Sequence, residues 1–150
     1  MSHAETIQTF DIEATAESAT KTRVSTRGFE FVVDEPPALG GEDDGPSPVE
    51  YLLGAWAGCL TVVVHHVAEE RDIDVSDVSF SVAGDLDPRK LLSNAEGIRA
   101  GFQEIRVTIE LESDIGAIER ESFITEVEDR CPVGDTIEAE TPTSITTTVA

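Results

Sequence analysis

The residues of this 150-residue chain best suited to chemistry are its only two cysteines, Cys59 and Cys131. Cys59 lies in an uncharged, almost wholly apolar segment, residues 51–64, whereas Cys131 opens the sequence CPVGD. A cysteine thiolate is a strong nucleophile, and two thiols that meet can cycle between a dithiol and a disulfide. Free cysteines also serve as small buried apolar residues. The residue types alone therefore allow two interpretations, a redox pair or two inert packing cysteines.

The first cysteine needs a cation from another segment in order to react. Cys59 falls in the third turn of a predicted helix, where the field of the helix dipole has largely faded. Burial alone would raise the pKa of this thiol and favour the packing role. The best candidate for the cation is Arg27, in a predicted turn between two strands, and Arg23 and Arg130 are weaker candidates.

The second cysteine has a different setting. Cys131 precedes Pro132, which cannot continue a helix but suits the first position of a new one. We therefore predict that Cys131 caps a short helix through Ile137, where exposed N–H groups favour a thiolate and make it a good leaving group. The alternative is a solvent-facing residue at a helix end with no chemical role.

The helix that carries Cys59 has a clear predicted start. Ser47, Pro48 and Glu50 match a capping box with proline at the first helical position. Glu50 has a second possible role, which is to orient an arginine towards Cys59. Because Glu50 and Cys59 are more than two helical turns apart, such a link must pass through a third residue such as Arg27.

Other patterns for chemistry are weak. His65 and His66 are adjacent, so they point in different directions on a helix and do not form a metal pair. The chain has no zinc-type spacing, no phosphate-binding glycine loop and no G-x-S-x-G motif. We expect no metal and no bound cofactor, and we interpret Trp56, the sole tryptophan, as a core or interface residue.

Hydrophobic periodicity predicts the helices and strands that position these candidate residues. The pattern predicts helices over 48–71 and 117–130 and strands over six segments. The first helix is apolar on nearly all sides through residue 64, so we predict that it is the buried central element. The result is a single α+β domain of residues 1–150 that opens with a three-stranded meander. The predicted strands are residues 7–17, 21–26, 29–34, 75–84, 103–112 and 142–149.

The charge excludes some functions. Acidic residues number 31 and basic residues 10, which gives a net charge of −21. Such a surface repels nucleic acid and anionic membranes. It suits either an acidic module that binds a basic partner or adaptation to a salt-saturated cytosol, in which high ionic strength screens like charges. The acids are dispersed along the whole chain, which favours the halophilic interpretation.

Location is predicted from the same sequence. The uncharged segment 51–64 is too short to span a bilayer, and the N-terminus lacks the basic and apolar regions of a signal peptide. We therefore expect a soluble cytoplasmic protein, in which the thiols are kept reduced.

Four segments resemble the OsmC/Ohr family of thiol-dependent hydroperoxide reductases, which are osmotically inducible proteins. They are DEP at 34–36, GG at 40–41, GPSPVEYLLGAWAGCL at 45–60 and CPV at 131–133. The predicted order of elements is similar along nearly the whole chain. The loop EP-x-x-x-GG-x-x-x-G-P-x-P is closer to the less characterised branch of the family.

The resemblance implies a fold and a mechanism. It implies an intertwined homodimer with the cysteine helices at its centre and active sites near the subunit interface. Cys59 would be the peroxidatic cysteine that attacks a hydroperoxide, and Cys131 the resolving cysteine, in an antioxidant stress response. An external dithiol, lipoyl-based in the organic-hydroperoxide branch, would reduce the disulfide without a bound cofactor. Arg27 and Glu50 are the nearest matches to an arginine that holds the thiolate and a glutamate that orients it.

Two other functions stay open at this stage. On the same fold, the chain would serve as a non-catalytic module that binds a small ligand or senses oxidation, with an apolar helix lining the pocket. Thiols that react slowly and only at alkaline pH would favour that alternative. An acidic scaffold protein is the third hypothesis, and the dispersed charge makes it the least attractive.

Overall fold

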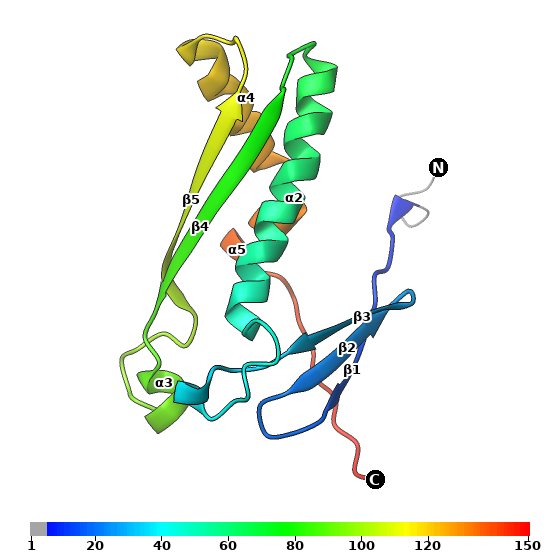
Figure 1. The fold of residues 1–150 in the computed structure, drawn as a ribbon, viewed down its shortest axis with the longest axis vertical. Helices are drawn as coiled ribbons and strands as arrows, with labels where there is room; N and C mark the ends of the chain where they lie inside the picture. Colours follow the sequence, from blue (N-terminus) through cyan, green and yellow to red (C-terminus); the bar gives the residue numbers. More distant parts are fainter. Residues whose placement is uncertain (1–5) are drawn as a thin grey trace. The chain divides into compact units, whose positions relative to one another are not determined.

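The protein has a mixed α+β fold, seen in a computed structural model that describes residues 6–150 (Figure 1). The chain divides into a first unit that ends at residue 52 and a second unit of residues 53–150. The boundary lies inside the long helix α2, Pro48–Glu70. The single domain over 1–150 stays a prediction.

Three antiparallel strands in the order β1-β2-β3 form the sheet of the first unit, and they confirm the predicted meander. β1 is shorter than the predicted segment 7–17, because only residues 13–16 pair with β2 and residues 7–12 are in no helix or strand. The strands are Glu13–Ala16, Thr22–Thr26 and Phe29–Val33.

The turn between β2 and β3 carries Arg27, as predicted. Arg27 and Gly28 have φ values of 49° and 86°, and a two-residue type I′ hairpin requires positive φ at both positions. The Arg27 guanidinium lies 5.3 Å from the centre of the Phe29 ring, which is a cation–π distance. Arg27 therefore lies at the tip of a well-formed hairpin.

A buried carboxylate organises the loop between β3 and α2, which contains the short 3₁₀ helix η1, Pro37–Leu39. The Asp34 side chain is fully buried and accepts hydrogen bonds from the Glu35 N–H at 2.8 Å and the Thr20 hydroxyl at 2.9 Å. The N–H groups of Asp44 and Glu42 also donate to it. Burial would raise the pKa of Asp34, but these donors together hold it below its usual value.

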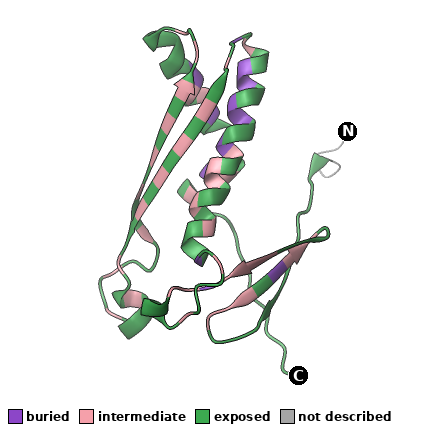
Figure 2. Ribbon diagram, viewed as in Figure 1, coloured by how far each residue is buried: buried purple, intermediate pink, exposed green. Residues whose placement is uncertain are grey.

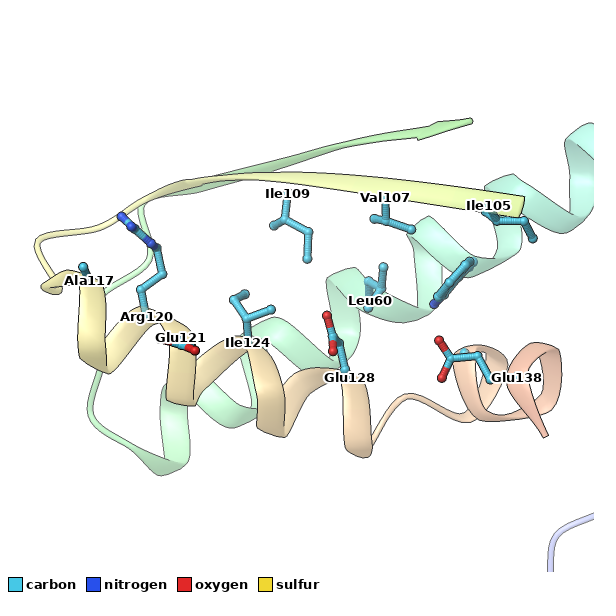
Figure 3. Close-up of a pocket in the computed structure, with 12 residues that line it drawn as sticks. Leu60, Ile105, Val107, Ile109, Ala117, Arg120, Glu121, Ile124, Glu128 and Glu138 are labelled. Atoms are coloured by element: carbon cyan, nitrogen blue, oxygen red, sulfur yellow. The ribbon is translucent and has the colours of Figure 1, made fainter. Parts of the chain in front are cut away.

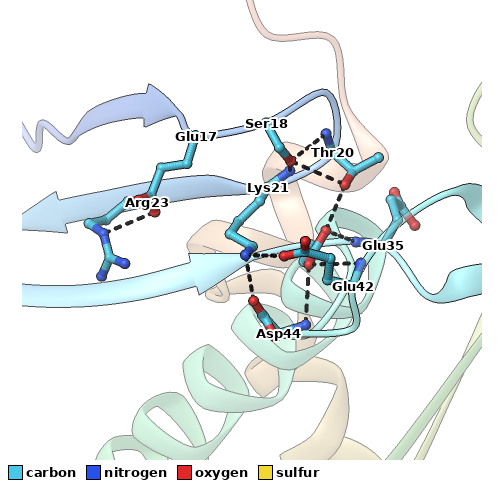
Figure 4. A network of polar contacts seen from close by, with 9 residues as sticks. Glu17, Ser18, Thr20, Lys21, Arg23, Glu35, Glu42 and Asp44 are labelled. Atoms are coloured by element: carbon cyan, nitrogen blue, oxygen red, sulfur yellow. Dashed lines mark hydrogen bonds and ion pairs between the residues drawn. The ribbon is translucent and has the colours of Figure 1, made fainter.

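Two acidic side chains of this loop form ion pairs with one lysine (Figure 4). The Lys21 ammonium lies 2.5 Å from a carboxylate oxygen of Glu42 and 2.5 Å from one of Asp44. Hydrogen bonds to these two acids raise the pKa of Lys21. Although Asp34, Glu42 and Asp44 have oxygens within 4.8 Å of one another, Lys21 already supplies the cation, and we assign no metal there.

Helix α2 begins with the predicted capping box. The Ser47 N–H donates to the Glu50 carboxylate at 2.9 Å, and the Glu50 N–H donates to the Ser47 hydroxyl at 3.4 Å. The Tyr51 hydroxyl, in the first turn, donates to the Val32 carbonyl of β3 at 2.8 Å. The helix ends at Glu70, one residue before the predicted end.

The second unit places helices against an antiparallel hairpin (Figure 1). β4, Asp77–Leu86, pairs with β5, Phe102–Glu112, and the short helix α3, Arg89–Ser93, lies in their connection. Alternate residues of both strands pack on the core that α2 and α4, Ala117–Asp129, also form. The last helix, α5, is Pro132–Glu138, as the proline at position 132 predicted.

The predicted strand 142–149 is wrong for this structure. These residues are in no helix or strand and are exposed throughout, with Ile145 and Val149 94% and 99% exposed. Their β-branched composition favours an extended chain, but a strand also needs a neighbouring strand to accept its backbone hydrogen bonds. The segment finds no such neighbour in the described chain.

The core of the second unit lies on one face of α2 (Figure 2). Leu60, Val64 and Val67 of α2 pack with Phe123 and Val127 of α4, and all five are at most 2% exposed. The opposite face of α2 is exposed in the single chain, as the helix's burial pattern shows.

Candidate dithiol site

The fold of the second unit brings the two cysteines together. Cys59, on α2, is half-buried beside the core, and Cys131, at the N-cap of α5, is 1% exposed. Both are free thiols, and they lie near enough to each other for Cys59 to raise the pKa of Cys131. Two sulfurs from distant segments are therefore neighbours, as formation of a disulfide between them requires.

The environment of Cys131 keeps this thiol protonated. Burial raises the pKa of Cys131, and the neighbouring Cys59 raises it further. The N–H groups of Gly134 and Val133 act in the opposite direction, but burial prevails. We expected the helix N-terminus to favour a thiolate at Cys131, and this expectation is wrong because the thiol lies inside the core.

Trp56 lies against the same helix N-terminus. A side chain added to Gly134 would lie 2.9 Å from the Trp56 Nε1 atom and 3.5 Å from the Cys131 Cβ. Trp56 is also three residues before Cys59, so both lie on neighbouring parts of the α2 surface. The sequence signal for this contact is the three-residue spacing of Trp56 from Cys59 and of Gly134 from Cys131.

A cavity of about 620 Å³ opens beside Trp56 (Figure 3). Its walls are apolar side chains of β5, α4 and α2, and Figure 3 shows those of β5 facing α4 across it. Four charged side chains from α4 and α5 also line it: Arg120, Glu121, Glu128 and Glu138. Sequence reasoning missed this cavity because its walls come from four separate elements.

The other predicted site residues lie in the first unit. Arg27 lies at the hairpin tip, and Glu50 in the capping box, where hydrogen bonds from Ser47 lower the Glu50 pKa. The weaker candidate Arg23 lies 3.0 Å from the Glu17 carboxylate. The roles of Arg27 and Glu50 at Cys59 stay predictions.

Arg130, the residue before Cys131, belongs to an ion-pair network. Its guanidinium donates to Glu70 of α2 at 2.5 Å and to Glu126 of α4 at 2.9 Å. Arg71 donates to the same Glu126 at 2.7 Å. Arg130 therefore ties the end of α4 to the end of α2 next to Cys131, and its charge is already paired with two carboxylates.

Together these features define an α+β dithiol protein, with one thiol on an apolar helix and the second at the cap of the last helix. The chain belongs to the OsmC-like protein family, whose family model matches residues 41–146. No curated protein matches the chain.

Solved structures of this family share the fold. An OsmC-like protein from Mycoplasma pneumoniae has a TM-score of 0.75 and 23% identity, over 87% of this chain and 88% of its own. The organic hydroperoxide resistance protein OsmC from Legionella pneumophila has a TM-score of 0.66 and 21% identity, over 88% and 90%. The organic hydroperoxide resistance protein OhrB of Bacillus subtilis has a TM-score of 0.57 and 20% identity, over 87% of this chain and 91% of its own.

Helix α2 is long and apolar enough to cross a membrane by length and composition alone. Core helices of soluble proteins pass the same test, so this is weak evidence for a span. Proteins of the OsmC-like family are soluble, and α2 carries part of the core of the second unit.

Proposed function

We propose that this chain is a thiol-dependent hydroperoxide reductase in which Cys59 is peroxidatic and Cys131 is resolving. The observation that carries the proposal is the proximity of these two thiols, which come from distant segments of the sequence and pack at the same core. Membership in a family with solved structures named as organic hydroperoxide resistance proteins supports a peroxide-related redox role.

The reaction has three balanced steps. The Cys59 thiolate attacks the terminal oxygen of the hydroperoxide, the O–O bond breaks, and the alkoxide takes a proton from water and leaves as an alcohol. Cys131 attacks the resulting sulfenic sulfur, so that a disulfide forms and the hydroxyl leaves with the thiol proton as water. An external dithiol, of the lipoyl type, then reduces the disulfide to two thiols and is itself oxidised to a disulfide.

The protonation state of Cys131 supports this division of labour. A thiol with a raised pKa is a poor first nucleophile at neutral pH, but it can donate a hydrogen bond to a thiolate at Cys59. The more exposed Cys59 is the thiol that a small molecule reaches first. The buried Cys131 is then protected from peroxide until Cys59 has been oxidised.

We assign supporting roles to Arg27 and Glu50. Arg27 would hold the Cys59 thiolate, and Glu50 would orient the guanidinium. Arg27 makes no ion pair with any carboxylate among residues 6–150, so its charge is available. The lowered pKa of Glu50 keeps its carboxylate charged at neutral pH.

We propose that the functional unit is a homodimer in which α2 packs against α2 of a second copy. The exposed face of α2 carries Gly54, Ala55, Gly58 and Val62, and Val62 is 68% exposed. Apart from the helix itself, no atom of residues 6–150 lies within 4 Å of a Cβ added at Gly54 or Gly58, so a second backbone can approach closely there. An exposed apolar strip of this kind is typical of a protein interface.

The test is an assay of tert-butyl hydroperoxide consumption with dihydrolipoamide as reductant. We expect the parent to turn over, and Cys59→Ser to lose activity by at least a hundredfold. Cys131→Ser should still consume about one equivalent of peroxide and then stop, because no disulfide can form within the chain. A Cys59→Ser variant as active as the parent would remove Cys59 from the mechanism.

The buried state of Cys131 also favours a second candidate, a cytoplasmic redox sensor or ligand-binding module on the same fold. In that case one equivalent of peroxide would oxidise the thiols, but a dithiol would restore them only slowly. Non-reducing mass spectrometry combined with the turnover assay separates the two functions. Disulfide formation without turnover would support the sensor.

A further inference from the structure

Arg130 and Cys131 are consecutive residues at the junction of α4 and α5. Arg130 is the C-cap of α4 and Cys131 is the N-cap of α5, so no linker separates the two helices. The Arg130 N–H donates to the Glu126 carbonyl of α4 at 3.1 Å. The Cys131 carbonyl accepts a hydrogen bond from the Asp135 N–H of α5 at 2.9 Å. Whatever holds the Arg130 side chain in place therefore acts on Cys131 through a single peptide bond.

The Arg130 side chain connects this junction to α2. Its guanidinium is bidentate on the Glu70 carboxylate, with N–O distances of 2.5 Å and 3.3 Å. Two hydrogen bonds to one carboxylate fix the orientation of a guanidinium as well as its position. The Arg130 side chain is 34% exposed, so solvent and salt screen these bonds less than those of a fully exposed pair. The junction is therefore attached to the end of α2 by a well-defined bond.

Glu70 and Cys59 lie on the same face of α2. They are eleven residues apart, which corresponds to about three helical turns and about 16 Å along the axis. Arg130 binds Glu70, and Cys131 lies near Cys59. Two consecutive residues of the junction thus meet α2 at two separate points. Two points of attachment restrict rotation of the junction on α2 more than either point alone.

The charge of Arg130 does not act directly on the Cys131 sulfur. Burial is the main cause of the raised pKa of Cys131, and Arg130 is not among the described groups that shift it. Its guanidinium is instead paired with the carboxylates of Glu70 and Glu126. Arg130 can therefore influence this thiol through the position of the backbone, and not through the field of a free charge.

Formation of a disulfide is demanding in its geometry. The two sulfurs have to approach to about 2.05 Å, with a dihedral angle near 90° about the new bond. A thiol that samples many positions rarely meets these conditions, so a restriction of its backbone raises the rate of closure. An attachment next to Cys131 is placed to supply that restriction.

We propose that Arg130 is a positioning residue for the resolving step, because its bond to Glu70 holds Cys131 in place on α2. This inference rests on the proposed function, since it concerns the second step of that reaction. In this step the Cys131 sulfur attacks the sulfenic sulfur of Cys59. The S–S bond forms, the S–O bond breaks, and the hydroxyl leaves with the thiol proton as water. Arg130 and Glu70 exchange no proton or electron.

The first test separates the two chemical steps of a single turnover. The protein is mixed rapidly with tert-butyl hydroperoxide without reductant, quenched in acid after different delays, and analysed by mass spectrometry. We expect Arg130→Met to form the sulfenic acid at the parent rate. Closure of the disulfide should slow about tenfold, which is the order expected for one lost charge-assisted hydrogen bond. Closure at or above the parent rate would overturn the inference.

Three further variants serve as matched comparisons. Arg106→Met removes an arginine that is likewise bidentate, on Asp85, but lies on the exposed face of β5. Arg71→Met removes the other guanidinium that ties α4 to the end of α2 and leaves Arg130 paired. Both should close at the parent rate, and Arg130→Lys should recover part of it. If either control slows closure as much as Arg130→Met, lost charge or lost stability explains the effect and the inference is wrong.

A double-mutant cycle tests whether Arg130 acts through Glu70. Glu70→Gln alone should slow closure, because it weakens the same bond. Arg130→Met/Glu70→Gln should close no more slowly than Arg130→Met, because the second change removes a partner that is already lost. Effects of the two substitutions that simply add would contradict the proposed route through Glu70.

An equilibrium with dithiothreitol tests the positioning role without peroxide. In mixtures of its reduced and oxidised forms, Arg130→Met should lower the ratio of protein disulfide to dithiol about tenfold relative to Arg106→Met, because the effective concentration of one thiol at the other falls. Equal ratios would overturn the inference. A parent that forms the disulfide but never turns over peroxide would refute the proposed function and leave the positioning role standing. A parent that forms no disulfide in either assay would refute both.

Discussion

At the scale of single residues, the two thiols are chemically unequal although they are neighbours. We expect iodoacetamide to label Cys59 before Cys131 at neutral pH, since Cys131 is 1% exposed and its pKa is raised by burial. Labelling of Cys131 should accelerate only above the pH at which an ordinary thiol ionises. Peptide mass spectrometry over a pH series measures both rates, and equal labelling at neutral pH would contradict the assignment.

Gly134 is the backbone position on which this arrangement depends. The side chain of Gly134→Ala would meet the Trp56 Nε1 atom at 2.9 Å, so the indole or α5 has to move. We expect a loss of about 1–3 kcal/mol in the free energy of unfolding and slower disulfide formation. Urea denaturation measures the first effect and non-reducing mass spectrometry the second.

The control for this substitution is Gly116→Ala. Gly116 has negative φ, and beyond its two chain neighbours no described atom lies within 4 Å of an added Cβ, so this variant should keep the parent rate of disulfide formation. Parent-like disulfide formation in Gly134→Ala would show that the contact with Trp56 does not position Cys131.

From the sequence, the positions of the site residues could be predicted better than their burial and their pKa values. The capping position of Cys131 followed from Pro132, which restricts the local backbone. The direction of the Cys131 pKa could not be predicted, because it depends on burial by residues from other elements. The role of Trp56 was missed for the same reason.

At the scale of elements, the start of α2 is held by a reciprocal cap. Ser47→Ala removes the acceptor of the Glu50 N–H, and such a loss typically costs about 1 kcal/mol of stability. The lowered pKa of Glu50 adds stability above the unfolded pKa of about 4.3 that is lost as pH falls through the folded value. Denaturation of the parent and Ser47→Ala at neutral and acid pH should therefore show a difference that shrinks in acid.

The exposed face of α2 predicts a specific response to substitution. Apart from α2 itself, a Cβ added at Gly58 meets no atom of residues 6–150 within 4 Å, so we expect the isolated fold to accept Gly58→Leu. In the proposed dimer the larger side chain separates the two helices, and we expect a monomer. Light scattering after size exclusion measures the mass, with Ala139→Leu as an exposed control outside α2. An unchanged mass would remove this face from the interface.

Helices and paired strands were predictable because their periodicity is local. The alternation of β4 and β5 and the cap of α2 all appear in the residues that form them. The strand prediction for residues 142–149 was wrong for a physical reason. β-branched residues favour an extended backbone, but a strand exists only with a hydrogen-bonded neighbour. The sequence indicates which segment is extended, but it does not show which strand would pair with it.

At the scale of the whole molecule, the net charge of −21 is the dominant property. Mutual repulsion of the acids destabilises the compact state, and salt screens it. Salt also weakens ion pairs such as Lys21 with Glu42 and Asp44, but exposed ion pairs contribute only about 0–1 kcal/mol each. With 31 acidic and 10 basic residues, screening of repulsion should prevail, so salt should stabilise the fold.

We therefore expect the midpoint of thermal unfolding to rise by at least several degrees between dilute buffer and molar KCl. The rise should be steepest at low salt, where each increment shortens the screening length most. Sucrose at matched osmolality is the control, because it favours compact states without screening charge. A midpoint that sucrose raises as much as KCl would attribute the effect to solvent exclusion. A midpoint that does not depend on KCl would contradict the halophilic interpretation, because repulsion between the acidic side chains would then not limit the stability of the fold.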